Sequence, residues 1–256
     1  MIEIYPVKIK KITLGDNFTE ILIEKTRNIL RDDDIIVVSS KPILISSNKV
    51  VNVNRIRKIS RTSMEYASKC CLDPRFVELV FQHADYVFGC TKGFLLASIN
   101  DILLPNAGID RKNVPGELYA VPDFDFRGFA RNLYFKVKRE VGVKVGVIVI
   151  DSTVAPLRRG TRGVALAVYG FKPIKSYVGE KDLFDKEIMV TTLSIADCIA
   201  SAALLAIGEG RESVPAAVVR GVNVEFIEED LSDELLIDIN DCLYSEALMK
   251  SKYSPK

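Results

Sequence analysis

The pattern of hydrophobic positions is dominated by one nearly unbroken apolar run, residues 143–150, in which almost every side chain is β-branched. A short run of this kind is typical of a strand buried on both faces of a sheet, and it is too short to cross a membrane. Asp151 and Ser152 follow it directly. We therefore expect the strand to end at Asp151 and to present oxygen groups at the rim of a sheet, where open α/β sheets bind ligands. The alternative is that Asp151 only caps the next turn.

Other short runs rich in Val, Ile, Leu, Phe or Tyr lie between turn-forming residues and predict further strands. They cover residues 2–7, 35–39, 86–88, 94–97, 102–104, 164–169, 188–193 and 215–219. Apolar residues at helical spacing, preceded by capping residues, predict the helices. These begin after Asp16 or Asn17, run from Ser60 to Cys71, restart at Asp73, span 128–141 and 194–207, and begin again at Ser232. Strands and helices mix without strict alternation, which favours the α+β or mixed α/β class in one undivided chain.

Composition and charge limit the functions to be considered. Hydrophobic residues make up 48% of the chain and charged residues 27%, as in a soluble globular protein. The 35 Lys and Arg balance 34 Asp and Glu, so net charge gives no support to a nucleic-acid or membrane partner. The N-terminus lacks the order of segments found in a signal peptide, and we expect a cytoplasmic protein. Tryptophan is absent and Ile is abundant, a composition that leans toward a thermophile.

The five cysteines show no metal-binding spacing, and their odd number argues against a full set of disulfides. Two of them, Cys70 and Cys71, are adjacent on a predicted helix, and Cys198 lies on another. We therefore expect reduced, buried thiols, as in most cytosolic proteins.

Three oxygen-bearing side chains are candidates for a metal site. Asp110 lies in a loop rich in turn formers, and Asp151 and Ser152 follow the buried strand. If the two segments converge, they form an oxygen-only set that suits Mg²⁺ or Mn²⁺. Such a cation neutralises charge in phosphoryl or acyl-phosphate chemistry. Asp123 and Asp125 could form another metal rim, or only a turn before the next helix.

Basic side chains near these segments are candidates for phosphate contacts. They are Lys10, Lys11, Lys41, Arg158, Arg159 and Arg162. The alternative for the arginines is a solvated loop. A P-loop is excluded, because no glycine-rich loop ends in Lys-Ser or Lys-Thr. The run Gly208-Glu209-Gly210 is most simply a helix stop, although its backbone could approach a nucleotide.

Several stretches, taken together, resemble the coenzyme F420-0:gamma-glutamyl ligase family. They are Asn106-Ala107-Gly108-Ile109-Asp110 with Asn113, Val145-Gly146-Val147-Ile148 with Asp151-Ser152, Arg158-Arg159-Gly160, Gly179-Glu180-Lys181-Asp182-Leu183, the segment from Ala196-Asp197 to Gly208-Glu209, and Pro215-Ala216-Ala217-Val218-Val219-Arg220-Gly221. Each is weak alone, but they keep the order and spacing of the family from about Ile2 to Asn223. The combination is fairly specific for this family.

The resemblance implies a GTP-dependent ligase. In this family GTP phosphorylates the terminal carboxylate of a deazaflavin cofactor precursor, and the amine of L-glutamate attacks the acyl phosphate to form a γ-linked amide. The implied fold is one mixed α+β domain with two interleaved lobes, in an intertwined homodimer. The divalent metal ligands of the family match Asp110, Asp151 and Ser152. Together with the basic and glycine-rich segments, the nucleotide candidates are Lys11, Ser40, Lys41, Asn113, Gly208 and Glu209, with Arg158 and Arg159 as phosphate or substrate candidates.

The chain departs from the family at positions that concern the nucleotide and the substrate. Where the family has a lysine after the second strand, this chain has Ile45. Loss of a charge-assisted phosphate contact there would cost ~2 kcal/mol or more. The family's Asn-Gly-Arg is Thr153-Val154-Ala155 here, and its Asp-Pro-Asp is Asp123-Phe124-Asp125. The metal positions therefore match the family better than the nucleotide and substrate positions do.

Three hypotheses stay open. The chain is an active ligase of this family, with Lys41 or Lys49 in place of the missing lysine. It is a ligase-fold enzyme with another substrate or nucleotide. Or it is a non-catalytic paralogue that binds nucleotide, or none, and acts as a binding or structural subunit. The presence of both Asp110 and Asp151 favours an enzyme.

Overall fold

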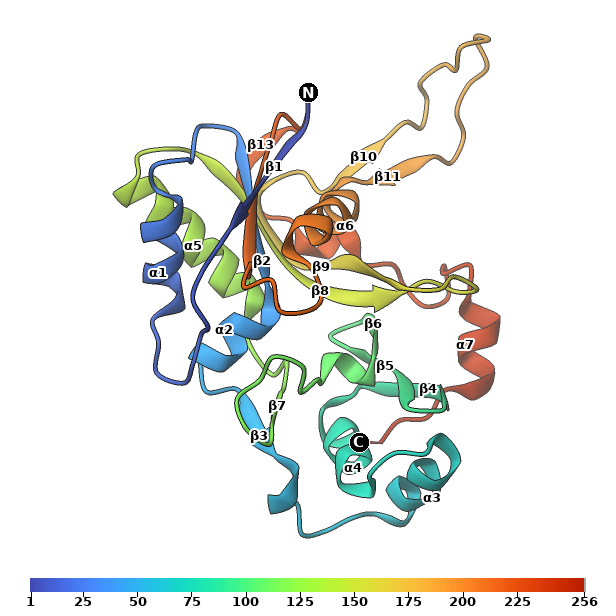
Figure 1. Cartoon of the computed structure of the whole chain (residues 1–256). Coiled ribbons are helices and arrows are strands. Elements are labelled where there is room, and N and C mark those ends of the chain that lie inside the picture. The colour runs from blue at the N-terminus through green and yellow to red at the C-terminus, as the bar shows by residue number, and fades with distance from the viewer. Residues whose placement is uncertain (256) are drawn as a thin grey trace.

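The computed structural model describes residues 1–255 and has a mixed α/β architecture, which confirms the predicted fold class (Figure 1). Its largest unit is a six-stranded sheet. In spatial order the strands are β1 (Glu3–Val7), β12 (Ala216–Arg220), β2 (Asp34–Ser39), β8 (Val145–Val154), β9 (Thr161–Phe171) and β13 (Phe226–Asp230). Only β2 and β8 run parallel, and every other neighbouring pair of this sheet is antiparallel. No helix within residues 1–255 has the length and apolar content that a membrane crossing requires.

Both faces of the large sheet are covered by helices (Figure 1). The covering helices are α1 (Phe18–Thr26), α2 (Ser40–Ser46) and α5 (Phe126–Glu140) on one face and α6 (Ile195–Ile207) on the other. Side chains alternate along a strand, so Ile36 lies in the core with α1 and α5, whereas Ile35 lies in the core with α6. This two-sided burial is the reason why the central strands are nearly unbroken apolar runs.

A smaller unit is formed by a three-stranded antiparallel sheet and two helices with a hydrophobic core of their own. Its elements are α3 (Arg61–Cys70), α4 (Pro74–His83), β4 (Tyr86–Thr91), β5 (Phe94–Ile99) and β6 (Ile102–Pro105). The chain enters it through β3 (Val50–Asn52) and leaves it through β7 (Leu118–Ala120), and these two strands pair with each other. The end of the chain returns to it: α7 (Ser245–Ser251) precedes Tyr253, which exchanges backbone hydrogen bonds with Val87 of β4.

A long hairpin, formed by β10 (Ile174–Ser176) and β11 (Thr192–Ser194), projects away from the rest of the chain beside α6 (Figure 1). Apolar side chains near its tip are exposed, with Leu183 at 98% and Phe184 at 80% of their surface. The strand predicted over residues 188–193 is wrong in its extent, because only the three residues of β11 pair with β10.

The helix starts predicted at Asn17, Ser60 and Asp73 are confirmed. The side chains of Asn17, Ser60 and Asp73 accept hydrogen bonds from backbone N–H groups in the first turns of α1, α3 and α4. Asp125 caps α5 in the same way, with its Oδ1 2.8 Å from the nitrogen of Gly128, so the turn interpretation of this residue is correct. These contacts join residues close in sequence, which is why the sequence alone predicts them.

Three local predictions are wrong. β8 does not end at Asp151 but continues to Val154, because β9 still pairs with it there. No helix is predicted between residues 39 and 60, yet α2 begins directly after Ser39. No long helix starts at Ser232: a short 3-10 turn forms there, and the Ser232 hydroxyl is buried and bonds to the backbone of Val168.

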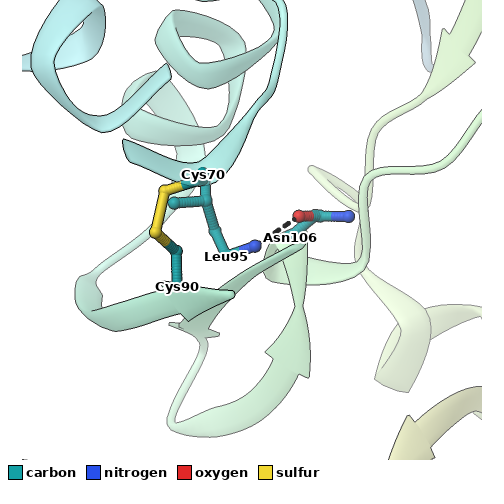
Figure 2. The surroundings of a disulfide bond; sticks show 4 residues. All are labelled: Cys70, Cys90, Leu95 and Asn106. Carbon is teal, nitrogen blue, oxygen red and sulfur yellow. Dashed lines mark hydrogen bonds between the residues drawn. A yellow bond between two sulfur atoms is a disulfide. The ribbon is translucent and has the colours of Figure 1, made fainter. Parts of the chain in front are cut away.

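The expectation of reduced, buried thiols is also wrong. Cys70 at the end of α3 and Cys90 in β4 form a disulfide, with their Cα atoms 5.8 Å apart (Figure 2). The two residues meet because α3 packs against β4, a tertiary contact that the spacing of the cysteines does not indicate. Of the remaining cysteines, Cys71 and Cys198 are exposed.

Candidate active site

The candidate site forms where β2 ends and β8 continues. Ser39 is the last residue of β2 and pairs with Ile150 of β8. Beyond this pair β2 turns into α2, whereas β8 goes on alongside β9. Ser40 and Asp151 therefore lie side by side at the rim of the parallel strands, and the Ser40 hydroxyl donates a hydrogen bond to Asp151 Oδ2 over 3.0 Å.

The loop that carries Asp110 reaches the same rim in an unusual backbone conformation. Asn106 (φ 54°), Ala107 (φ 51°) and Gly108 (φ 74°) all lie in the left-handed region, which is costly for alanine. A Cβ atom on Gly108 would lie 3.7 Å from Asp151 Oδ2. That distance is an ordinary contact, which places the loop against the buried strand; glycine is needed because of the left-handed backbone and because a Cβ would lie only 3.2 Å from Leu104 Cδ1.

Lys41 is the basic group next to the two aspartates. Its Nζ lies 2.6 Å from Asp110 Oδ2, and its charge also acts on Asp151. Asp110 therefore pairs directly with the ammonium group, and Asp151 lies within range of its charge. Burial raises the pKa of Asp151 above its ordinary value, although Lys41 opposes this rise. Burial acts in the same direction on Asp110, but Lys41 and the backbone N–H of Lys112 outweigh it and hold the pKa of Asp110 below its ordinary value.

A second polar cluster surrounds Glu209, just beyond the end of α6. Ser152 Oγ donates to Glu209 Oε1 over 2.5 Å, and Thr161 Oγ1 donates to the same oxygen over 3.0 Å. Lys112 forms an ion pair with the other carboxylate oxygen. Burial opposes the charge on Glu209, but these hydrogen bonds outweigh it and lower the pKa of Glu209. Because adjacent strand residues face opposite ways, Ser152 contacts this cluster while Asp151 contacts the first one.

A cavity of about 520 Å³ adjoins both clusters, which is within the usual size range of small-molecule sites. All six nucleotide candidates line it: Lys11, Ser40, Lys41, Asn113, Gly208 and Glu209. Lys10, Lys112, Asp151 and Ser152 line it as well. Asn113 is held in place by a hydrogen bond from its Nδ2 to the carbonyl oxygen of Gly210 over 2.7 Å. The tertiary structure thus brings segments from five distant parts of the chain to one cavity with several lysines on its wall.

Other candidates lie elsewhere. Arg158 and Arg159 are exposed in the turn between β8 and β9 and do not line the cavity. Lys49, one alternative to the missing lysine, pairs with Asp123 outside the cavity at 3.2 Å. Ile45 does line the cavity, but its side chain is only 3% exposed and belongs to the hydrophobic core. At the position of the family lysine, this chain therefore contributes an apolar side chain to the cavity wall and no charge.

The donor set is that of a site for a hard cation. Residues 1–255 contain no group of three His, Cys, Asp or Glu side chains gathered as metal ligands. Asp110 and Asp151, with the hydroxyls of Ser40 and Ser152 nearby, offer only oxygen atoms. Mg²⁺ and Mn²⁺ suit such oxygens, and Mg²⁺ in particular is usually held by one or two carboxylates together with waters and substrate phosphates. The residues present therefore fit such a cation in company with a phosphate-bearing ligand.

Lys112 and Thr161 belong to the site, although the sequence does not single them out. Lys112 lies between the candidates Asp110 and Asn113 in the sequence, and this position could have identified it as a site residue. Thr161 has no such signal, because it reaches Glu209 only through the pairing of β9 with β8.

Comparisons with known proteins define the class of the chain as a ligase. The profile of a family described as F420-0:gamma-glutamyl ligase matches residues 6–221. The chain is 31% identical over 225 residues to the coenzyme F420:L-glutamate ligase of Methanosarcina mazei, which covers 88% of this chain and 87% of that protein. It is 32% identical over 224 residues to the protein of the same name from Archaeoglobus fulgidus, covering 87% of this chain and 89% of that protein. For the namesake from Haloarcula marismortui the identity is 30% over 254 residues, covering 96% of each.

The chain therefore belongs to the F420-0:gamma-glutamyl ligase family. The match spans the large sheet except β13, the smaller unit except its C-terminal segment, and both clusters of the candidate site, and it confirms the resemblance drawn from the motifs.

Proposed function

We propose that the chain is a GTP- and divalent-metal-dependent ligase that forms a γ-glutamyl amide bond between L-glutamate and a deazaflavin cofactor precursor, coenzyme F420-0. The observation that carries the proposal is that the loop of Asp110, which pairs with Lys41, lies against Asp151 beside a cavity of about 520 Å³ that gathers the nucleotide candidates. The names of the relatives support the choice of acceptor and amino acid.

The proposed reaction has two steps. The γ-phosphoryl group of GTP passes to the terminal carboxylate of the acceptor, which gives an acyl phosphate and GDP. The amine of glutamate then attacks the acyl carbon. The new C–N bond forms, the C–O bond to phosphate breaks, phosphate leaves with the electron pair, and the amine gives up a proton. Both steps shift negative charge among phosphate oxygens, so the site needs positive groups that are already in place.

The side chains of the site divide this work. Lys11 and Lys41 on the cavity wall supply positive charge for phosphate oxygens. Asp110 and Asp151 are the residues that would hold Mg²⁺ or Mn²⁺, whereas the hydroxyl of Ser152, the third predicted ligand, contacts Glu209 in the second cluster. Such a cation, when bound, neutralises charge on the phosphates during phosphoryl transfer. Lys41 already offsets the charge of Asp110 and so lowers the repulsion between this carboxylate and an incoming nucleotide.

A second candidate function is that of a paralogue with the same fold that uses another substrate, or that binds nucleotide without catalysis. Ile45 favours it, because a side chain that is 3% exposed in the core stands where the family has a lysine. Lys41 and Lys112 both line the cavity and can supply the missing charge. For this reason the ligase remains the first proposal.

Titration calorimetry with GTP tests the nucleotide and metal site. We expect GTP to bind in the presence of Mn²⁺, and we expect this binding to disappear when the metal is removed by a chelator. The substitution Asp151→Asn should weaken GTP binding at least about tenfold, because it removes one charged metal ligand. Asp241→Asn is the matched control, because this exposed aspartate lines neither cluster nor cavity. Equal GTP affinity in both variants would refute the assignment of Asp151.

Mass spectrometry of the product separates the two candidate functions. Incubation with the deazaflavin precursor, GTP and L-glutamate should give a product heavier by one glutamyl unit. Tight, metal-dependent GTP binding without this product would instead favour the second candidate function.

We further propose that the chain forms a homodimer through the β10–β11 hairpin. The hairpin projects away from the rest of the chain (Figure 1) and exposes Leu183, Phe184 and Val190 over 80–98% of their surface. Exposed apolar side chains on a protruding segment are stabilised when a second copy covers them, and self-complementary pairing of two such arms is compatible with twofold symmetry.

A further inference from the structure

A second, smaller cavity of about 210 Å³ borders the same Asp110. Asp110 links the two cavities, because it lines the small one and its carboxylate pairs with Lys41, which lines the large one. Its volume is less than half that of the large cavity, which suits a ligand smaller than a nucleotide, such as a free amino acid.

The wall of the small cavity offers hydrogen-bond donors. Asn106 Oδ1 accepts from the backbone N–H of Leu95 over 2.8 Å, which leaves the amide nitrogen pointing away from Leu95 (Figure 2). This nitrogen has two N–H groups to donate and no acceptor within residues 1–255. The guanidinium of Arg111, on the same wall, forms no ion pair with a carboxylate of the described chain. Tyr119 adds a phenol whose ring packs on Phe76, with centroids 5.1 Å apart.

One carboxylate on this wall retains acceptor capacity for a cationic group. Asp110 accepts from the backbone N–H of Lys112 over 2.9 Å and from Lys41 over 2.6 Å, which uses two of the roughly four lone-pair sites of a carboxylate; a bound metal ion would take a third and leave one. Asp73 also lines the cavity, but Arg75 already holds both of its oxygens. The cavity therefore presents one acceptor for an ammonium group and several donors for carboxylates, which is complementary to an acidic amino acid.

We propose that this small cavity binds the amino-acid substrate, free L-glutamate, with its α-ammonium on Asp110 and a carboxylate on Arg111 and the Asn106 amide. The inference rests on the proposed function, because that reaction requires a glutamate site beside the site of phosphoryl transfer. Through Asp110 the amine would lie next to the carboxylates and Lys41, where the acyl phosphate forms.

Binding of L-glutamate to the full chain, measured by calorimetry and by ligand-observed NMR with and without GTP and Mn²⁺, tests the proposal. Asn106→Asp keeps the oxygen that accepts from Leu95 but replaces the donating nitrogen by an acceptor. Arg111→Gln removes the guanidinium charge. Each variant should weaken L-glutamate about tenfold and raise KM for glutamate, while the affinity for GTP changes less than about twofold. Arg57→Gln is the matched control, because this exposed arginine lines neither cavity.

Thermal unfolding of each variant verifies that it is folded before its binding is compared. Unchanged glutamate binding in both folded variants, or no glutamate binding to the wild type under either condition, would overturn the proposal. If ligation proceeds but KM for glutamate is the same in all variants, the proposed function stands and the glutamate site falls. If ligation is absent but glutamate binds and depends on Arg111 and Asn106, the glutamate site stands and the proposed function falls.

Discussion

A buried ion pair ties the strands β12 and β2 together far from the candidate active site. Arg220 donates from Nε to Asp34 Oδ1 and from Nη2 to Asp34 Oδ2, each over 2.7 Å, and Nη2 also donates to the carbonyl oxygen of Ile29 over 2.7 Å. The Asp34 side chain is 0% exposed and that of Arg220 18%. The ring of Tyr5 covers the guanidinium, with its centroid 4.9 Å from Cζ.

Arg220→Met should therefore destabilise the fold strongly. The substitution keeps an apolar stem of similar length but leaves the carboxylate of Asp34 in the interior without its positive partner. Removal of one member of a buried ion pair costs about 3–5 kcal/mol. For a chain of this size each kcal/mol corresponds to roughly 2–4 °C, so the midpoint of thermal unfolding should fall on the order of 10 °C.

Arg75→Met is the matched control. Arg75 also pairs with an aspartate through two hydrogen bonds, but the side chains of Arg75 and Asp73 are 39% and 40% exposed. An exposed pair of this kind contributes less than about 1 kcal/mol. Urea unfolding of both variants gives the two free energies directly. Similar losses in the two variants would refute the reasoning, because burial is the main difference between the pairs.

Two further predictions concern pH and assembly. Burial, together with the Glu228 carboxylate that accepts a hydrogen bond from its hydroxyl, raises the pKa of Tyr134 to about 12. This tyrosine therefore stabilises the fold fully below about pH 10, and it loses that contribution as the pH rises toward about 12. Urea unfolding across this pH range should show a steeper loss of stability in the wild type than in Tyr134→Phe, and equal slopes would contradict the assignment. Replacement of Leu183 and Phe184 by serine should convert a dimer into a monomer in light scattering after size-exclusion chromatography. A wild-type chain that is already monomeric would rule out the proposed dimer.

Elements whose causes are local could be predicted from the sequence. Asn17 and Ser60 begin helices because their side chains accept from N–H groups three residues further along. Residues 143–150 form a buried strand because almost every side chain there is apolar and β-branched. Ser232 is the same residue type as Ser60, yet it begins no long helix, since its hydroxyl bonds to Val168 on a strand 64 positions away.

Part of the candidate site could be predicted as well. The motif around Asp110 and the strand end at Asp151 identify both carboxylates through the family resemblance. Which of the candidate side chains contact one another could not be predicted from the sequence. Ser152, for example, meets Glu209 only where the end of α6 packs beside β8. The pairing of Cys70 with Cys90 likewise depends on how a helix packs on a sheet.

The sequence by itself determined the family, the fold class and the list of chemically capable side chains, because these follow from short motifs and local hydrophobic periodicity. Tertiary structure decided which of those side chains share a cavity. Ser40 and Asp151 are 111 positions apart. They meet because Ser39 pairs with Ile150 in the parallel strands β2 and β8, so the next residue of each strand lies at the same edge of the sheet. The small cavity beside Asp110 depends on the packing of the loop at Asn106 against β5 within the core of the smaller unit, a contact between residues 11 positions apart that no local periodicity indicates.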